Sequence, residues 1–137
     1  MAKELKDLGA DSICIKDMAG MISPVAAAAL TAALKKDVGL MVQLHSHCTS
    51  GMAPVAYMAA AQAGCDVLDT AFSPFAWGTS QPPTESMVAA FKDTPYDTGL
   101  DIDLLVEIGE YFKGVRQNYA KLLNPLSERV QTDILVH

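Results

Sequence analysis

The sequence predicts an α/β protein built around a small parallel β-sheet. Glycines at positions 9, 39 and 64 end segments of helical composition, and they are 30 and 25 residues apart. Repeated strand–helix units of this length are typical of parallel sheets, because parallel strands need a long crossover connection between them. A short apolar run of strand-like composition follows each glycine, at residues 11–17, 40–44 and 66–72.

The predicted elements alternate along the chain. Ser23 before Pro24 is the pattern of a helix start, with a serine N-cap and a proline at the first helical position. Lys35 and Lys36 suit the negative end of the helix that follows. In order, we expect helix 2–9, strand 11–17, helix 25–36, strand 40–44, helix 53–63, strand 66–72, loop 73–83 and helix 83–91.

A different kind of segment closes the chain. An amphipathic helix is predicted over residues 102–122, and residues 134–137 have the composition of a further strand or of the approach to one. We therefore divide the chain into residues 1–100, which hold the strand–helix units, and residues 101–137, which begin a helical segment. The apolar stripe of the helix consists of Leu105, Ile108, Phe112, Val115 and Tyr119.

Composition excludes several classes of function. The chain has 137 residues, a formal net charge of −6 and no basic cluster larger than Lys35-Lys36, which argues against a nucleic-acid partner. No apolar run reaches the length of a membrane span, and residues 1–5 show no signal-peptide core. The three cysteines are widely spaced and odd in number, which favours free thiols in the cytoplasm.

The length leaves two architectures open. A complete (β/α)8 barrel needs about 250 residues, so 137 residues specify either a small open sheet or a part of a barrel. The chain begins in the last turns of a helix and stops abruptly, which favours a part of a barrel. In both architectures the carboxyl ends of the parallel strands meet at one edge, where a functional site is expected.

The candidate metal ligands follow the first two strands. His45 and His47 flank Ser46, so their rings share one face and lie about 7 Å apart, within reach of a single divalent metal. Lys16 ends the neighbouring strand, and CO₂ would turn its repulsive amine into an anionic carbamate with oxygen ligands. The simpler alternatives are that Lys16 pairs with Asp17 or extends into solvent, and that the histidines are ordinary core or surface residues.

Two hydroxyl groups lie in the loop after the third strand. Thr79 and Ser80 could each carry a proton, although most loop hydroxyls only satisfy nearby backbone groups. A free hydroxyl is too weak an acid to serve as a base by itself, so such a role requires a relay within a coupled step.

Three motifs follow one another at the predicted strand ends. They are Ile15-Lys16-Asp17-Met18-Ala19-Gly20, then Leu44-His45-Ser46-His47 with Thr49-Ser50-Gly51, and then Thr79-Ser80-Gln81-Pro82. Together they resemble the carboxyltransferase domain of biotin-dependent enzymes: pyruvate carboxylase and its separate B subunit, the oxaloacetate decarboxylase α subunit and the transcarboxylase 5S subunit. The resemblance covers nearly the whole chain. It implies a TIM barrel, of which this chain would supply about strands six to eight and the start of the helical region behind them.

The resemblance also implies a chemistry. Carboxyl transfer would run between carboxybiotin and pyruvate or oxaloacetate, on a divalent metal (zinc, manganese or cobalt) held by carbamylated Lys16, His45 and His47. Thr79 matches the threonine that carries a proton between biotin and the enol of pyruvate. Biotin would be carried on another domain or subunit, so the implied partners are a biotin carrier and either biotin carboxylase or membrane subunits of a decarboxylase.

Parts of the family pattern lie outside this sequence. The family's metal is also held by an aspartate on the first barrel strand, its substrate-binding arginine is likewise upstream, and its biotin-bearing module comes later. We therefore expect a fragment that is inactive alone and binds metal weakly. Its open sheet edges are expected to make it poorly soluble or to join copies into homo-oligomers.

Two other functions stay open. Metal-dependent aldol-type lyases and synthases that act on acyl-CoA substrates also carry a His-x-His motif on a late barrel strand. They need neither the Lys16 motif nor the Thr79 loop, so these two features favour carboxyl transfer. The third alternative is a non-catalytic α/β module.

Overall fold

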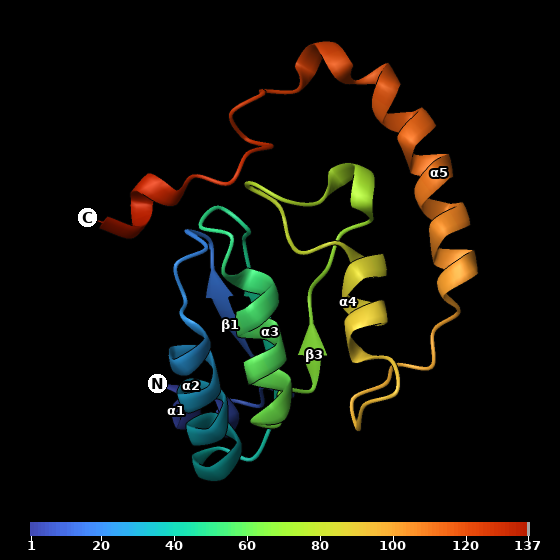
Figure 1. Ribbon diagram of the computed structural model, residues 1–137. Coiled ribbons are helices and arrows are strands. Elements are labelled where there is room, and N and C mark those ends of the chain that lie inside the picture. The colour runs from blue at the N-terminus through green and yellow to red at the C-terminus, as the bar shows by residue number, and fades with distance from the viewer. Residues whose placement is uncertain (137) are drawn as a thin grey trace.

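The computed structural model describes residues 1–136 and has the predicted alternation of strands and helices (Figure 1). The strands are β1 (Ser12–Asp17), β2 (Met41–Ser46) and β3 (Val67–Leu68). The α-helices are α1 (Ala2–Asp7), α2 (Pro24–Asp37), α3 (Ala53–Gln62), α4 (Thr84–Phe91) and α5 (Ile102–Asn118). Short 3₁₀ helices lie at η1 (Ser73–Phe75), η2 (Ala120–Leu122) and η3 (Thr132–Val136).

The three strands form one parallel sheet in the order β1-β2-β3, which confirms the predicted α/β class with a parallel sheet. Lys16 of β1 lies opposite His45 of β2, and Leu44 lies opposite Leu68 of β3. The carboxyl ends of the strands therefore meet at one edge of the sheet.

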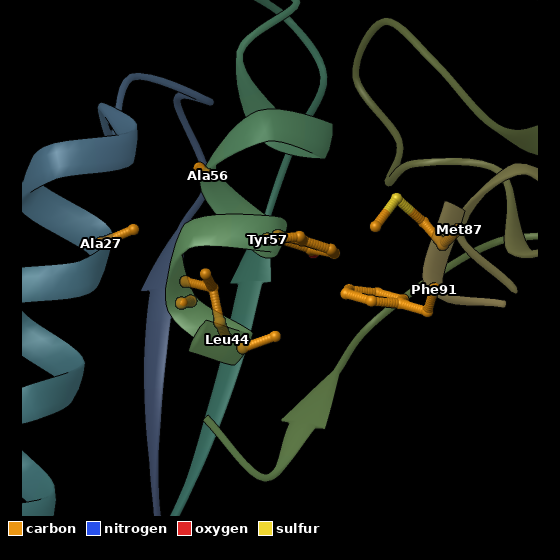
Figure 2. Packing of buried hydrophobic residues seen from close by; sticks show 8 residues of the cluster. Ala27, Leu44, Ala56, Tyr57, Met87 and Phe91 are labelled. Atoms are coloured by element: carbon orange, nitrogen blue, oxygen red, sulfur yellow. The ribbon is translucent and has the colours of Figure 1, made fainter. Parts of the chain in front are cut away.

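Helices α2 and α3 lie side by side on one face of the sheet (Figure 1). Val42 and Leu44 of β2 point into this layer and are buried. Small alanine side chains allow the helices to approach the strands closely. Figure 2 shows Leu44 and Tyr57 beside α3, with Phe91 of α4 pointing toward Tyr57. The buried cluster consists of Ala27, Leu44, Ala56, Tyr57, Ala60, Ala61, Met87 and Phe91.

The alternate residues of the strands form the opposite face. Cys14 and Lys16 of β1 are exposed there, and Gln43 and His45 of β2 are half-buried. This division follows from the two-residue period of a strand. The predicted metal ligands therefore lie on the face away from α2 and α3.

Tyr57 of α3 ties the ends of β2 and β3 together. Its hydroxyl accepts a hydrogen bond from the Ser46 N–H at 3.0 Å and donates one to the carbonyl of Asp69 at 2.8 Å. The side chain is fully buried, and burial raises the pKa of this phenol far above its usual value. Tyr57 therefore stays neutral and fixes the spacing of the two strand ends.

At the opposite end of β3, Asp66 holds β2 and α2. Its carboxylate pairs with the Lys35 ammonium at 2.8 Å and accepts the Val42 N–H at 2.7 Å. The bonds from Lys35 and Val42 lower the pKa of Asp66 below its ordinary value. The carboxylate therefore stays ionised and fastens the beginning of β3.

The third strand is shorter than predicted. Residues 66–72 were expected in the sheet, whereas only Val67 and Leu68 form strand. The Asp69 N–H still donates to the Leu44 carbonyl at 3.1 Å, but Ala71 already pairs with Pro83 instead of β2. The chain thus leaves the sheet as soon as it reaches the loop before α4.

The C-terminal segment departs further from expectation. Helix α5 ends at Asn118 rather than 122, because the Leu122 N–H donates to the Tyr119 carbonyl in the tighter 3₁₀ pattern. The strand expected at 134–137 is wrong for residues 134–136, which lie in η3, while residue 137 lies outside the described residues. Local turns satisfy the backbone of this segment, which an unpaired strand could not do.

Two further expectations bear on the surroundings of the protein. Cys14, Cys48 and Cys65 are free thiols, as predicted. Within the described part of the chain, no helix combines the length and the apolar character needed to cross a membrane.

Candidate active site

The structure brings the predicted metal ligands together at the carboxyl ends of β1 and β2. The rings of His45 and His47 have centroids 5.2 Å apart and are tilted by 53° to each other. Lys16 lies directly opposite His45 in the parallel register, and side chains at paired positions project from the same face of a sheet. Because Ser46 points to the opposite face, the side chains of Lys16, His45 and His47 share one side of the sheet.

Asp17 ties the ends of the two strands and is not a partner of Lys16. Its carboxylate accepts the N–H groups of Met21 and Ile22 at 3.1 and 2.9 Å, and the Ser46 hydroxyl at 2.8 Å. Among residues 1–136, Lys16 forms no ion pair. Lys16 is thus exposed beside the histidines and available for modification.

The loop after β1 packs against the turn that carries His47. Gly20 has φ +67°, and a Cβ atom at this position would lie 2.4 Å from the His47 carbonyl oxygen. The Ser50 hydroxyl donates to the Gly20 carbonyl, and the His47 N–H donates to the Asp17 carbonyl at 3.1 Å. Only glycine fits this approach, which explains its place in the Lys16 motif.

His45 is held by residues to which the sequence prediction gave no role. Its Nδ1 lies 2.7 Å from a carboxylate oxygen of Asp69, and the other oxygen of that carboxylate accepts the Gln43 amide at 2.6 Å. On the other side of the ring, the Gln81 amide nitrogen lies 3.2 Å from His45 Nε2. A carboxylate in the middle of the predicted strand 66–72 was the signal that could have identified Asp69.

The surroundings of His47 favour its neutral form. Burial lowers the pKa of His47, and the neighbouring His45 and Lys16 lower it further, while Asp17 acts in the opposite direction. A neutral imidazole is the form that binds a metal.

These residues fit a divalent metal if Lys16 is modified. His45 and His47 offer two nitrogen ligands, but residues 1–136 contain no group of three His, Cys, Asp or Glu side chains able to hold a metal ion. A carbamate on Lys16 would supply an anionic oxygen at the position opposite His45. The chain therefore offers part of a coordination sphere.

Among residues 1–136, no hydrogen bond joins Thr79 to His45 or His47. Its N–H and its hydroxyl both donate to the Ser127 carbonyl, at 2.7 and 3.2 Å, and it lines a cavity of about 740 Å³ between η1, α5 and the following turns. The next residue, Ser80, accepts the Cys48 N–H at 2.7 Å. Burial raises the pKa of Cys48 to about 12, so this thiol is not a nucleophile.

Comparison with known proteins shows where the chain belongs. Residues 1–111 match the family model described as HMGL-like. The chain belongs to the HMGL-like family. It is similar to the pyruvate carboxylase B subunit of Methanothermobacter thermautotrophicus, with 57% identity over 99% of the chain, and to that of Methanocaldococcus jannaschii, with 53% identity over 100%.

A solved structure gives the same result. The HMGL-like chain superposes on the carboxyl transferase domain from Rhizobium etli pyruvate carboxylase, determined with pyruvate and biocytin, with a TM-score of 0.93. The identity is 38%, over 99% of this chain and 23% of that one. The comparisons confirm the resemblance carried by the three motifs. The chain spans 24% of the length of the two archaeal relatives named above.

We expect Gly20→Ala to destabilise the protein more than Gly99→Ala. Both glycines have φ +67°, but a Cβ atom at Gly99 meets nothing within 4 Å, whereas one at Gly20 meets the His47 carbonyl. The left-handed conformation costs an alanine about 1–2 kcal/mol at either position, and the steric clash adds about 1–3 kcal/mol at Gly20. Urea denaturation measures both free energies of unfolding. Equal losses would show that the loop does not press on the His47 turn.

Proposed function

We propose that the chain is part of a biotin-dependent carboxyltransferase that moves a carboxyl group between carboxybiotin and pyruvate or oxaloacetate. The observation that carries this proposal is the placement of Lys16, His45 and His47 at the carboxyl ends of adjacent parallel strands. The similarity to relatives named as pyruvate carboxylase supports carboxyl transfer over aldol-type chemistry on acyl-CoA.

We further propose that residues 1–100 form the C-terminal part of a TIM barrel, about strands six to eight, and that residues 101–137 begin a helical segment. Among the described residues, β1 and β3 each pair on one side only. Met41 is 54% exposed on the face that carries His45, where the remaining strands of a barrel would cover it. One-sided pairing is common to both architectures, and the uncovered Met41 side chain supports a barrel over a small open sheet.

Lys16, as its carbamate, His45 and His47 are the proposed ligands of zinc, manganese or cobalt. The carbamate forms when the neutral amine of Lys16 adds to the carbon of CO₂ and releases a proton. The histidines bind through unprotonated ring nitrogens, which the low pKa of His47 favours. When bound, such a metal supplies a Lewis acid for the keto oxygen of the substrate.

Thr79 is the proposed proton relay between biotin and the substrate. It stands two residues before Gln81, whose amide lies against His45, so its loop borders the candidate site. Its hydroxyl donates to the Ser127 carbonyl, and this bond must break before the hydroxyl can pass on a proton. The alternative role for Thr79 is to hold the segment around Ser127 against the loop.

The proposed partners follow from the reaction. Carboxybiotin would arrive on a biotin carrier, with biotin carboxylase or membrane subunits of a decarboxylase completing the cycle. We place the protein in the cytoplasm, which its three free cysteines support.

Lys16→Ala in the full-length protein that carries this chain should lower both bound metal and carboxyl transfer. The loss of an anionic ligand is expected to reduce each by at least about 10–100-fold. Elemental analysis gives the metal content, and oxaloacetate decarboxylation gives the activity. Lys36→Ala on the exposed side of α2 is the control and should change neither. Full metal content and activity in Lys16→Ala, or turnover of an acyl-CoA ester but not of oxaloacetate, would contradict the proposal.

Thr79→Ala is expected to slow carboxyl transfer by about 10²–10⁴-fold, the range for loss of a general acid–base group. Thr79→Ser keeps the hydroxyl and should retain most of the activity. The assay is transfer from carboxybiotin to pyruvate in the full-length protein. A wild-type rate in Thr79→Ala would contradict the relay role and leave Thr79 with the structural role of holding the segment around Ser127.

The isolated 137-residue chain is expected to self-associate or precipitate, to bind metal weakly and to be inactive. Its half-covered sheet exposes apolar side chains, of which Met41 is 54% and Val67 41% exposed. Light scattering measures the association state. A monodisperse monomer, or measurable decarboxylation of oxaloacetate by the chain alone, would refute this expectation.

A further inference from the structure

We propose that Asp69 is a positioning residue that keeps the proton of His45 on Nδ1, so that the lone pair of Nε2 is presented for metal binding. This inference rests on the proposed metal site. It concerns a residue of the third strand end that none of the three motifs contains.

Two contacts on opposite sides of the ring define its protonation. A carboxylate oxygen only accepts hydrogen bonds, so the 2.7 Å contact with Asp69 requires a proton on His45 Nδ1. In the neutral ring, Nε2 then carries the lone pair. The Gln81 amide nitrogen, a donor, lies 3.2 Å from this atom, as the same tautomer requires.

Asp69 is itself held from three directions. Gln43 donates to its second carboxylate oxygen at 2.6 Å, the Asp69 N–H donates to the Leu44 carbonyl at 3.1 Å, and Tyr57 donates to the Asp69 carbonyl at 2.8 Å. The side chains of His45 and Asp69 are only 15% and 29% exposed, so little water competes for the contact. The carboxylate therefore has a fixed position, and its hydrogen bond to Nδ1 fixes the orientation of the His45 ring.

The two histidines differ in the hydrogen bonds made by their ring nitrogens. Among the described residues, the ring of His47 has no hydrogen-bond partner, whereas both nitrogens of His45 have one. A bound ion would therefore meet one ring of fixed orientation, whose Nε2 the Gln81 amide must first leave, and one ring that can turn toward it. A hydrogen bond from the second ring nitrogen to a carboxylate is the usual way in which proteins orient a metal-binding histidine.

Asparagine cannot replace Asp69 in this arrangement. Gln43 and His45 each donate to a different oxygen of the carboxylate, and the amide of asparagine offers only one oxygen. When that oxygen faces Gln43, the NH₂ group faces His45 Nδ1 and moves the proton to Nε2. The opposite orientation keeps the proton on Nδ1 but requires Gln43 to turn its own amide over, so that the Gln43 oxygen accepts from the NH₂ group. Alanine at position 69 has no group that can bond His45 in either orientation.

The test compares wild type, Asp69→Asn and Asp66→Asn in the full-length protein that carries this chain, produced with ¹⁵N-labelled histidine. The ring ¹⁵N chemical shifts of His45, recorded at alkaline pH where imidazole is neutral, report the tautomer. A Zn²⁺ titration followed by the same signals reports binding. Asp66 lies at the other end of β3 and bonds Lys35 and Val42, so its variant controls for loss of a carboxylate on this strand. Asp69→Ala, which leaves no acceptor for His45 Nδ1, is measured beside these variants.

The expected result is the Nδ1–H form in wild type and Asp66→Asn, a shift toward the Nε2–H form in the two Asp69 variants, and about 10–100-fold weaker Zn²⁺ binding in those variants alone. An unchanged tautomer in both Asp69→Asn and Asp69→Ala would overturn the positioning role, and a wild-type His45 that does not respond to Zn²⁺ would overturn its role as ligand. If the tautomer and Zn²⁺ affinity change as expected but the full-length protein transfers no carboxyl group, the inference stands and the proposed function fails.

Discussion

The parallel pairing of β1 with β2 is the constraint on which the candidate site depends. It places Lys16 opposite His45, and a slip of one residue would put Asp17 in that position. The register is fixed on the other face of the sheet, where Val42 and Leu44 of β2 are buried on the side that α2 and α3 cover. The buried layer, which takes no part in the chemistry, thus decides which polar side chains meet at the opposite face.

Hydrogen bonds at the strand ends hold the residues of the candidate site in fixed positions. Asp17 joins β1 to the Ser46 hydroxyl, and Tyr57 joins the Ser46 N–H to the Asp69 carbonyl. The strand ends that carry His45 and Asp69 are therefore linked through a buried phenol. These hydrogen bonds involve backbone groups as well as side chains. The His45 ring is therefore held on a rigid part of the fold rather than on a mobile loop.

Sequence alone predicted the parts of the site that depend on local pattern. Alternation along β2 predicted a common face for His45 and His47, and the rule that parallel strands end at one edge predicted Lys16 beside them. The contacts of Asp69 join residues 24 and 26 positions apart, and they depend on the short pairing of β3, which was overestimated. The bond from Thr79 to Ser127 spans 48 residues and has no local signal.

The most direct test of the shared site is diffraction from the full-length protein, grown with Mn²⁺ and bicarbonate and measured at the metal absorption edge. An anomalous peak bonded to nitrogen atoms of both His45 and His47, with continuous density from a carbamate on Lys16, is the result predicted by the register of β1 and β2. A peak bound by other residues, or a Lys16 side chain turned away from the two rings, would contradict it.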